Sequence, residues 1–504
     1  MEIAYGSETC GENSFTISCT LLFPMKTYSS FIFTEHTWNH HAGKISLRYS
    51  LDGSIDFEET ILLPEPVSDE RLQKYEWEIE RCLNALHLIG GISYYKTCLP
   101  KKIEIPYMNL TKADAQFWNS VYENGLGEFF FKNNIDFRSL LHFPSKETKE
   151  EEPNMMRKRL PPNAMKRVLV PIGGGKDSIV TIELLKKSGA QITLLRMGSH
   201  PLITELAHLS GLPMITVKRS ISGNLFDLNA EGALNGHVPI TAYLSILSVL
   251  IAELYDFDAV IMSNERSANE GNVKFKGMDI NHQWSKSLAF ERALRRYLTD
   301  SIGTNIEYFS LLRPLSELKI SEIFTGFPKY FANVTSCNTN WKILRTAPAV
   351  DAEASLQGTK QIASEESGGA IKRRSAATSA LWCGKCPKCA FVFACMAAFL
   401  SKAELEKMFG TILFRHDWLM QLYRELLGTL NFKPFECVGT SDETKAAFLL
   451  AMQKKELNDT PVMKMFIKEV LPTIKDPEAL IASVMKASEQ HCIPQAFVPL
   501  IATR

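Results

Sequence analysis

The sequence has no excess of charge of either sign. Lysine and arginine together number 56, and so do aspartate and glutamate, so the formal net charge of the 504-residue chain is zero. Proteins that hold DNA or RNA by its phosphates usually carry a basic surplus. The balance counts against a nucleic-acid partner, although a local basic patch can be hidden in a neutral total. Nothing in the sequence marks an obligate protein partner.

Long apolar segments are also missing. No run of 18 or more apolar residues occurs, and a helix needs about that length to cross a bilayer. Residues 1–7 have neither the basic nor the apolar stretch of a secretory signal. The 11 cysteines are odd in number and three form one tight cluster, which fits a reducing compartment and a metal site better than a disulfide framework. We therefore expect a cytoplasmic protein without a membrane association.

What the sequence does contain is a glycine-rich turn between an apolar run and a helical pattern. Residues 168–172 are apolar, three glycines follow at 173–175, and Lys176, Asp177 and Ser178 open the next segment. Glycines let the backbone approach an anion, and a helix N-terminus favours negative charge. A Walker A loop needs Ser or Thr after its lysine, where Asp177 stands, and a Rossmann fingerprint needs a third glycine at Ser178. A glycine-rich turn without a ligand is the alternative.

Residues 165–335 alternate between short apolar runs and helical patterns, as in a doubly wound α/β fold with a parallel sheet. We expect strands over 168–172, 191–195, 214–217 and 259–262, and helices over 178–188, 204–210, 239–254 and 285–300. Ligands of such sheets bind at the carboxyl ends of the strands. The loops 173–178, 196–199 and 263–272 should therefore meet around one crevice.

The length suggests about three domains of ~150 residues. Residues 1–145 predict an N-terminal α+β domain, followed by a charged, proline-containing linker over 146–164. The domain should contain strands over 15–24, 44–63 and 94–105, a helix over 76–88 that ends at Gly90 and Gly91, and an aromatic helix or helix pair over 113–132.

Residues 336–504 predict a Cys-cluster region with mostly helical segments. We expect helices over 390–400, 403–408, 418–427, 445–455 and 477–486. Residues 347–380 have almost no bulky apolar side chain and predict a flexible insertion.

Cysteines at two short spacings predict a metal site. Cys383, Cys386 and Cys389 lie in one turn, at a spacing that presents sulfurs to a tetrahedral ion. Cys337 is the most suitable fourth ligand, and a structural Zn²⁺ is the first choice of metal. An iron–sulfur cluster, no metal, or Cys395 in place of Cys337 are the alternatives.

The loop 263–272 is rich in polar residues and lies at the ligand edge of the expected sheet. Arg266 can hold a phosphate or a carboxylate because its planar fork bonds two oxygens at once. Glu265 or Glu270, with Asp177, can hold Mg²⁺, which prefers oxygen ligands and nucleotide phosphates. A solvated surface loop would show the same composition.

Two further polar segments carry groups that can move protons. His282 lies among polar neighbours that include Lys286, and Glu436 and Cys437 interrupt the helical pattern near the C-terminus. A structural histidine and a loop with a buried cysteine are the simpler interpretations of these segments.

The glycine-rich turn resembles the loop of the PP-loop ATP pyrophosphatases, whose pattern is Ser-Gly-Gly-x-Asp-Ser. Gly174, Gly175, Asp177 and Ser178 match, whereas Gly173 stands where the family has its first serine. These enzymes cleave ATP between the α- and β-phosphates and attach AMP to an oxygen of the substrate. The resemblance implies a HUP-like PP-loop core over 165–335. ATP would be held by Gly173, Gly174, Gly175, Lys176, Asp177, Ser178 and Arg266, together with Mg²⁺.

A wider set of motifs resembles the bacterial UDP-N-acetylmuramoyl-L-alanyl-L-glutamate epimerase family. The motifs are residues 171–178, 263–272, 281–287, 383–391 and 433–440. The resemblance covers most of the chain from about 166 to 450, and the first domain with fewer motifs. Glutamine-hydrolysing PP-loop enzymes of the asparagine-synthetase kind are a poor match, because Glu2 stands where they need a cysteine.

The resemblance implies an ATP-dependent epimerase of peptidoglycan precursor synthesis. The terminal L-glutamate of UDP-MurNAc-L-Ala-L-Glu would become D-glutamate through an adenylated carboxylate, with release of AMP and pyrophosphate. His282, Lys286, Glu436 and Cys437 are the candidates for proton transfer. A PP-loop enzyme that amidates or thiolates a nucleoside or tRNA is the main alternative, and a nucleotide-binding protein without catalysis is the third.

Overall fold

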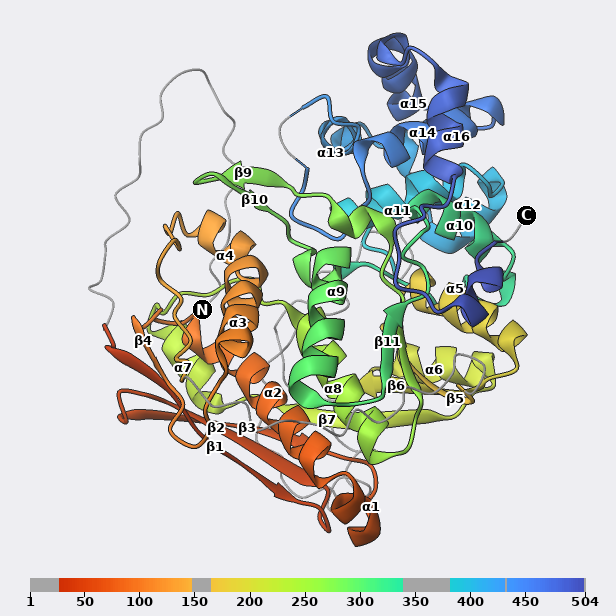
Figure 1. The fold of residues 1–504 in the computed structure, drawn as a ribbon. Helices are drawn as coiled ribbons and strands as arrows, with labels where there is room; N and C mark the ends of the chain where they lie inside the picture. The colour runs from red at the N-terminus through yellow and green to blue at the C-terminus, as the bar shows by residue number, and fades with distance from the viewer. Residues whose placement is uncertain (1–26, 147–164, 339–380, 431–432, 503–504) are drawn as a thin grey trace, which may run out of the picture.

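The protein is described by a computed structural model that covers residues 27–146, 165–338, 381–430 and 433–502. Its main feature is a nine-stranded sheet with the order β11-β8-β5-β6-β7-β3-β2-β1-β4 (Figure 1). Helices pack on both faces of the sheet. The α/β class and the mostly helical C-terminal region are thus confirmed. The predicted strand 15–24, the insertion 347–380 and nearly all of the linker 146–164 lie outside the described residues.

The parallel half of the sheet follows the predicted alternation. Its strands are β5 (Arg167–Pro171), β6 (Gln191–Met197), β7 (Met214–Ser220), β8 (Ala259–Met262) and β11 (Glu307–Ser310). The helices between them include α5 (Lys176–Leu185), α6 (Pro201–Ser210), α7 (Gly223–Ala230), α8 (Ile240–Leu254) and α9 (Leu288–Tyr297). From β5 the chain builds outward to β6 and β7 on one side, and then to β8 and β11 on the other. The strand order therefore reverses between β5 and β8, where doubly wound sheets bind ligands.

Alternate side chains of β5 pack on opposite faces of the sheet. Val168 and Val170 pack into the core with α5, α6 and the C-terminal helices, whereas Leu169 packs into the core that includes α8. Strands that are buried on both faces read as continuous apolar runs, which is why β5, β6, β7 and β8 were predicted. The short β11 was not predicted.

The N-terminal strands extend the same sheet. They are β1 (Ser30–Asn39), β2 (Lys44–Leu51), β3 (Ile55–Leu62) and the short β4 (Lys102–Glu104). The hairpin predicted over 44–63 is confirmed as β2 and β3, and β3 pairs antiparallel with β7. The buried Glu59 on β3 accepts bonds from Arg219 at 2.8–2.9 Å and from Tyr243 at 2.7 Å. One sheet thus runs through the predicted N-terminal and ATP-binding domains, whose boundaries stay a prediction.

Helix α2 (Glu76–Tyr95) corrects two predictions. It continues through Gly90 and Gly91, where an end was predicted, and it occupies the start of the predicted strand 94–105, of which only β4 forms. The glycines serve close packing: a Cβ at Gly90 would lie 2.4 Å from the Tyr49 hydroxyl, and one at Gly91 would lie 2.4 Å from the ring of Phe33. The aromatic helix pair is confirmed as α3 (Lys112–Gly125) and α4 (Gly127–Lys132).

The C-terminal helices gather at the end of the molecule opposite the N-terminal strands (Figure 1). They are α10 (Glu317–Thr325), α11 (Pro387–Ala397), α12 (Lys402–Phe409), α13 (Met420–Leu426), α14 (Ser441–Gln453), α15 (Pro461–Met465) and α16 (Pro477–Met485). The five helices predicted beyond residue 390 are present, whereas α15 and the hairpin β9 (Val273–Phe275) and β10 (Met278–Ile280) were not predicted. Among the described residues, none of the helices combines the length and apolar character needed to span a bilayer.

Candidate active site

The glycine-rich turn joins β5 to α5 at the point where the strand order reverses. Gly174 has a φ of 83°, a conformation that favours glycine, and Gly175 is the N-cap of α5. Within the part of the chain that the structure describes, no side chain caps α5 at Gly175, and an uncapped helix N-terminus is suited to an anion. Gly173 faces open space, so the serine expected from the resemblance would fit at this position without a clash.

Three carboxylates gather beside this turn. Oxygen atoms of Asp177, Glu265 and Glu317 lie within 4.8 Å of one another. Asp177 and Glu265 were predicted as a pair, whereas the alternative, Glu270, is exposed. Glu317 was missed. The signal for it was a polar residue that opens a helix soon after the strand β11, behind the N-cap Ser316.

Lys176 lies between two of these carboxylates. Its side chain is buried and forms ion pairs with Asp177 and Glu317. Burial lowers the pKa of Lys176, but the two negative charges outweigh burial and raise it above its usual value. Burial and the charge of Asp177 raise the pKa of Glu317. The glycine-rich turn is therefore followed by a buried cation that is paired with two carboxylates.

Lys286 interacts electrostatically with Glu265 of the acidic group (Asp177, Glu265 and Glu317) and with Cys437 of a second cluster. Burial lowers the pKa of its ammonium, but the nearby charges of Cys437 and Glu265 raise it further than burial lowers it. The backbone at Lys286 is fixed by the fully buried Arg313, which donates to the carbonyls of Lys286 and Glu265 and pairs with Glu291 at 3.0 Å. Arg313 thus holds the two residues in a constant relative position.

The second cluster brings together the other predicted proton-transfer residues. Burial raises the pKa of the Cys437 thiol, but Lys286, Lys388 and His282 lower it well below its usual value. Burial lowers the pKa of His282, yet hydrogen bonds with Cys437 and Glu128 raise it to about 9. At neutral pH these directions give a thiolate beside an imidazolium.

Glu436 lies beside this pair. Burial raises the pKa of its carboxyl, which Lys388 partly opposes, and the side chain of Asn338 donates to it. The structure therefore brings His282, Lys286, Glu436 and Cys437 into one site, although their catalytic roles stay a prediction.

Two further members of the cluster carry no signal in the sequence. Glu128 on α4 contacts His282 directly, and His237 lies 3.5 Å from the same carboxylate oxygen. Both residues lie far from the recognisable motifs, and Glu128 follows a glycine at the start of an aromatic helix.

Arg266 differs from its predicted role as a phosphate or carboxylate ligand. Its guanidinium donates to the backbone carbonyl of Val484 at 2.8 Å and to that of Lys486 at 2.7 Å. These carbonyls lie at the end of α16, where a helix leaves acceptors without intrahelical partners. The geometry favours a structural role, because the donors that would hold a ligand are engaged by the backbone.

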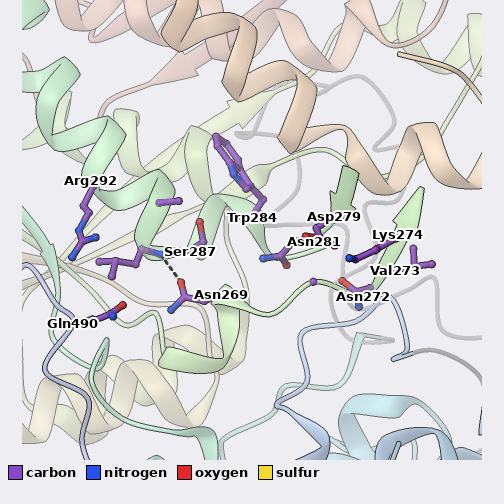
Figure 2. A pocket seen from close by; sticks show the side chains of 13 residues that line it. Asn269, Asn272, Val273, Lys274, Asp279, Asn281, Trp284, Ser287, Arg292 and Gln490 are labelled. Carbon is purple, nitrogen blue, oxygen red and sulfur yellow. Dashed lines mark hydrogen bonds between the residues drawn. The ribbon is translucent and has the colours of Figure 1, made fainter. Parts of the chain in front are cut away.

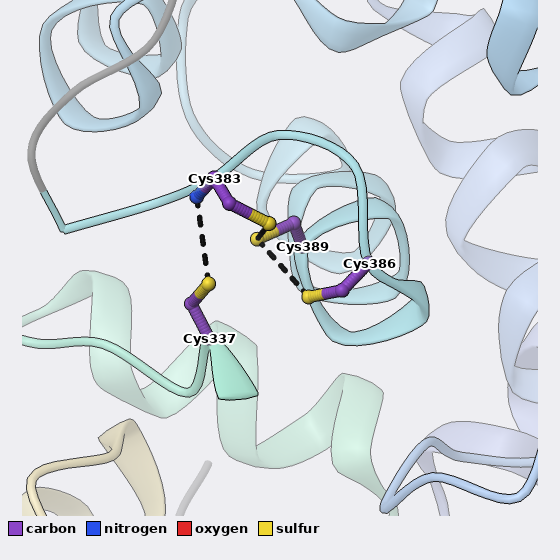
Figure 3. A group of neighbouring side chains, drawn as sticks. All are labelled: Cys337, Cys383, Cys386 and Cys389. Carbon is purple, nitrogen blue, oxygen red and sulfur yellow. Dashed lines mark hydrogen bonds between the residues drawn. The ribbon is translucent and has the colours of Figure 1, made fainter. Parts of the chain in front are cut away.

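The four predicted metal ligands converge on one point (Figure 3). The sulfurs of Cys337, Cys383, Cys386 and Cys389 lie within 4.8 Å of one another. Cys389 Sγ lies 3.7 Å from Cys383 Sγ and 3.5 Å from Cys386 Sγ, close to the ~3.8 Å edge of a tetrahedron with Zn–S bonds of about 2.3 Å. The donor set therefore fits a zinc ion.

The Cys cluster adjoins both parts of the site. Just before Cys337, the backbone N–H of Thr335 donates to the Gly174 carbonyl at 3.0 Å. Lys388, which acts on Cys437 and Glu436, lies between two of the cysteines. A metal held here would fix the glycine-rich turn and the cluster of His282 and Cys437 relative to each other.

A polar cavity of about 720 Å³ adjoins the His282 segment, and Figure 2 shows the side chains that line it. Its wall includes Asn272, whose side chain accepts from the backbone N–H of His282 at 2.9 Å. Figure 2 shows Lys274 and Asp279 from the hairpin on one side and Arg292 from α9 on the other. Trp284 supplies an aromatic face.

Comparison with protein families gives two matches along the chain. The family model of the MurL N-terminal domain matches residues 23–311, and that of the MurL C-terminal domain matches residues 370–480. The first match alone covers more than half of the sequence. The chain belongs to the MurL family.

Curated relatives match nearly the whole chain. A protein of Xanthomonas oryzae pv. oryzae is 33% identical over 476 residues, which are 94% of this chain and 97% of that protein. A Micromonospora protein is 34% identical over 489 residues (95% and 99%), and a Salinispora tropica protein is 35% identical over 461 residues (89% and 90%). Each is named UDP-N-acetyl-alpha-D-muramoyl-L-alanyl-L-glutamate epimerase.

The candidate site draws on both MurL matches. Glu128, Asp177, Glu265, His282 and Lys286 lie within the N-terminal match. Glu436, Cys437 and three of the clustered cysteines lie within the C-terminal match. Glu317 and Cys337 lie between the two matches, so the site combines both MurL regions with the segment that joins them.

Proposed function

We propose that this protein is an ATP-dependent epimerase that converts the terminal L-glutamate of UDP-MurNAc-L-Ala-L-Glu to D-glutamate in the cytoplasm, as a step of peptidoglycan precursor synthesis. The names of its full-length relatives support the reaction and the substrate. The observation that carries the proposal is the buried Arg313, which donates to the carbonyls of Glu265 and Lys286 and so holds the acidic group of Asp177, Glu265 and Glu317 close to Lys286. The charge of Cys437 in turn raises the pKa of Lys286. Activation by ATP and proton transfer can then occur on one bound glutamate.

Adenylation is the proposed first step. The parallel strands have the doubly wound order β7-β6-β5-β8-β11, and the glycine-rich turn lies at its reversal, which supports a PP-loop core. The turn would hold ATP through Gly173, Gly174, Gly175, Lys176, Asp177 and Ser178. Asp177, Glu265 and Glu317 would hold Mg²⁺, which takes carboxylate and phosphate oxygens. The α-carboxylate attacks the α-phosphorus, pyrophosphate leaves, and an acyl-AMP forms.

Activation prepares the Cα–H bond for cleavage. A free carboxylate opposes loss of the α-proton, because a second negative charge would form beside the first, and the acyl-AMP removes that opposition. The thiolate of Cys437 takes the proton from one face, and the ammonium of Lys286 stabilises the charge on the acyl oxygen. A proton returns to the opposite face from another group among His282, Lys286 and Glu436. Water then cleaves the acyl-AMP to D-glutamate and AMP.

The cavity beside Trp284 is the proposed binding site for the uridine diphosphate part of the substrate. Lys274 and Arg292 bring two cations to it, Trp284 offers a surface for a base, and the amides of Asn269 and Gln490 offer hydrogen bonds. Asn272 and Asn281 line the cavity. Asn281 directly precedes His282, and the side chain of Asn272 accepts a hydrogen bond from the His282 backbone N–H. A substrate bound here would extend its glutamate toward Cys437.

A deuterium experiment tests the reaction. Incubation of the protein with ATP and UDP-MurNAc-L-Ala-L-Glu in D₂O should release AMP and yield D-glutamate with deuterium at Cα. Release of AMP with a tRNA or a deazaguanine acid, and none with the muramyl dipeptide nucleotide, would instead support the nucleoside-modifying alternative. Binding of ATP without turnover of any of these substrates would support a nucleotide-binding protein.

The substrate site has its own test. Lys274→Glu should raise KM for the muramyl dipeptide nucleotide about tenfold, the effect of one lost charged contact, and leave KM for ATP unchanged. Lys276→Glu is the matched control, because Lys276 follows on the same hairpin but is not in the cavity wall. Equal effects of the two substitutions on KM would contradict the assignment of the cavity.

A further inference from the structure

The proton-transfer cluster contains a carboxylate that no motif singles out. Glu128 lies on α4, in the N-terminal region, and its side chain is 5% exposed. We propose that Glu128 is a positioning residue that holds the His282 imidazolium against the Cys437 thiolate, a role that rests on the proposed epimerase function. The three side chains then form a Cys–His–Glu relay assembled from three distant parts of the sequence.

The two oxygens of Glu128 have separate partners. Oε1 pairs with Lys132 one turn later on α4, and Oε2 lies against Nδ1 of His282. The other side of the imidazole is then available to Cys437, to which His282 is hydrogen-bonded. A carboxylate on one ring nitrogen fixes the tautomer and the direction of the other, as in catalytic triads.

The backbone around the relay is fixed independently of Glu128. Asn272 accepts from the His282 N–H at 2.9 Å and donates to the Pro434 carbonyl at 2.8 Å, which ties the His282 segment to the loop of Cys437. The remaining freedom is rotation of the imidazole ring about its own bonds. Glu128 restricts this rotation, so loss of its charge should alter the ring and the thiolate but not the fold.

His237 completes the surroundings of the carboxylate. Its ring centre lies 4.5 Å from that of His282. Burial and the positive charge of His282 lower the pKa of His237 to about 3, so it stays neutral. Glu128 thus faces one imidazolium, His282, and one ammonium, Lys132. Burial raises the pKa of Glu128, but these partners lower it to about 2.

A metal ion is the competing interpretation of the same group. Glu128, His237 and His282 offer ligand atoms within 4.8 Å of one another. The relay is favoured because Glu128 already has a cationic partner on each oxygen and because the imidazole contacts it directly. A metal would also need neutral His282, which the neighbouring thiolate disfavours.

The variant Glu128→Gln tests the proposal because it keeps the shape of the side chain and removes its charge. We expect epimerisation, measured as deuterium uptake at Cα, to slow about 10²-fold, as for loss of one acid–base element. ATP–pyrophosphate exchange and KM for ATP should stay unchanged, and Glu128→Asp should recover part of the rate. Glu123→Gln, on the preceding helix α3, is the matched control.

Site-resolved alkylation of Cys437 gives a second readout that a merely structural role would not change. In Glu128→Gln the pH at which Cys437 becomes reactive should rise, because the imidazolium that stabilises the thiolate is weakened. This measurement needs no turnover, so it tests the relay even if the wild-type protein fails the epimerase assay. An unchanged alkylation profile with an unchanged deuterium rate would overturn the proposal, as would a metal ion that binds in excess of the Cys cluster and is lost in His237→Ala.

Discussion

At the scale of single residues, the chemistry of the site depends on whether a neighbouring charge outweighs burial. Cys437, Cys98 and Cys492 are all only partly exposed in the structure. Burial raises the pKa of Cys98 and Cys492, whereas Lys286, Lys388 and His282 reverse this effect at Cys437. One residue type thus has opposite protonation states at neutral pH within one chain.

This contrast predicts selective alkylation. Iodoacetamide reacts with thiolates, so a lowered pKa makes Cys437 reactive below its ordinary range and a raised pKa leaves Cys98 and Cys492 as unreactive thiols. At about pH 7 we expect Cys437 to be labelled at least about tenfold faster than Cys492. Mass spectrometry of the labelled peptides would measure the three rates in one sample, and equal rates that rise together near pH 9 would contradict the assignment.

The sequence was informative about residue types and less so about their partners. Asp177, His282 and Lys286 were found because they lie in or just after polar loops at the expected ligand edge of the sheet. Cys437 was found because it lies in a polar turn that interrupts the C-terminal helical pattern. Glu128 and Glu317 were missed, because their role arises from contacts with His282 and Lys176, which lie 154 and 141 positions away. Arg266 was assigned from its chemistry alone, while its orientation is set by α16.

At the scale of elements, the glycines of α2 show how one residue type can have two meanings. Glycine commonly ends a helix, but it also permits close approach of another chain segment. Gly90 and Gly91 permit such a close approach, because Tyr49 on β2 and Phe33 on β1 pack directly against the helix at these positions. The sequence pattern alone cannot separate these meanings, since the contact comes from a different part of the chain.

Gly91→Ala should therefore destabilise the protein although alanine favours helices. The new Cβ would lie 2.4 Å from Cε1 of Phe33, a residue with no exposed surface. Overpacking of this kind costs about 2 kcal/mol, more than the ~0.5–1 kcal/mol gained in helix propensity.

The comparison needs a glycine with free space around it. Gly223→Ala is the control, because Gly223 opens α7 and a Cβ there would meet no atom within 4 Å. Urea unfolding followed by circular dichroism would measure both variants. An equal midpoint for the two would show that α2 can move away from β1 at little cost.

At the scale of the whole molecule, the Cys cluster is placed to hold distant segments together. Cys337 follows the segment that bonds the phosphate turn, and the other three cysteines begin α11. Structural zinc sites contribute directly to folding free energy. The fold class and the grouping of Cys337 with the other three cysteines followed from the sequence. The order of the strands and the contact of the Cys337 segment with the glycine-rich turn did not, because both depend on pairing between distant parts of the chain.

Removal of the metal should loosen the region around the phosphate turn. We expect about one zinc per chain, its loss in Cys337→Ser, and a melting temperature lowered by about 5 °C or more. Cys395→Ala is the control, because Cys395 is buried on α11 outside the group of four sulfurs. Metal analysis of the purified variants would decide between the two cysteines, and retention of zinc in Cys337→Ser would contradict the ligand assignment.

The pairing of β3 with β7 has a consequence for attempts to divide the protein. A fragment that began after residue 164 would keep the phosphate turn and Cys437 but would leave one edge of β7 without its neighbour at Arg219. It would also expose the apolar side of α8 that packs on α2, and the charge of Arg219 would lose Glu59. Unpaired strand edges promote aggregation. The fragment that begins after residue 164 should therefore be insoluble by itself, and adding the N-terminal fragment to it should not restore turnover.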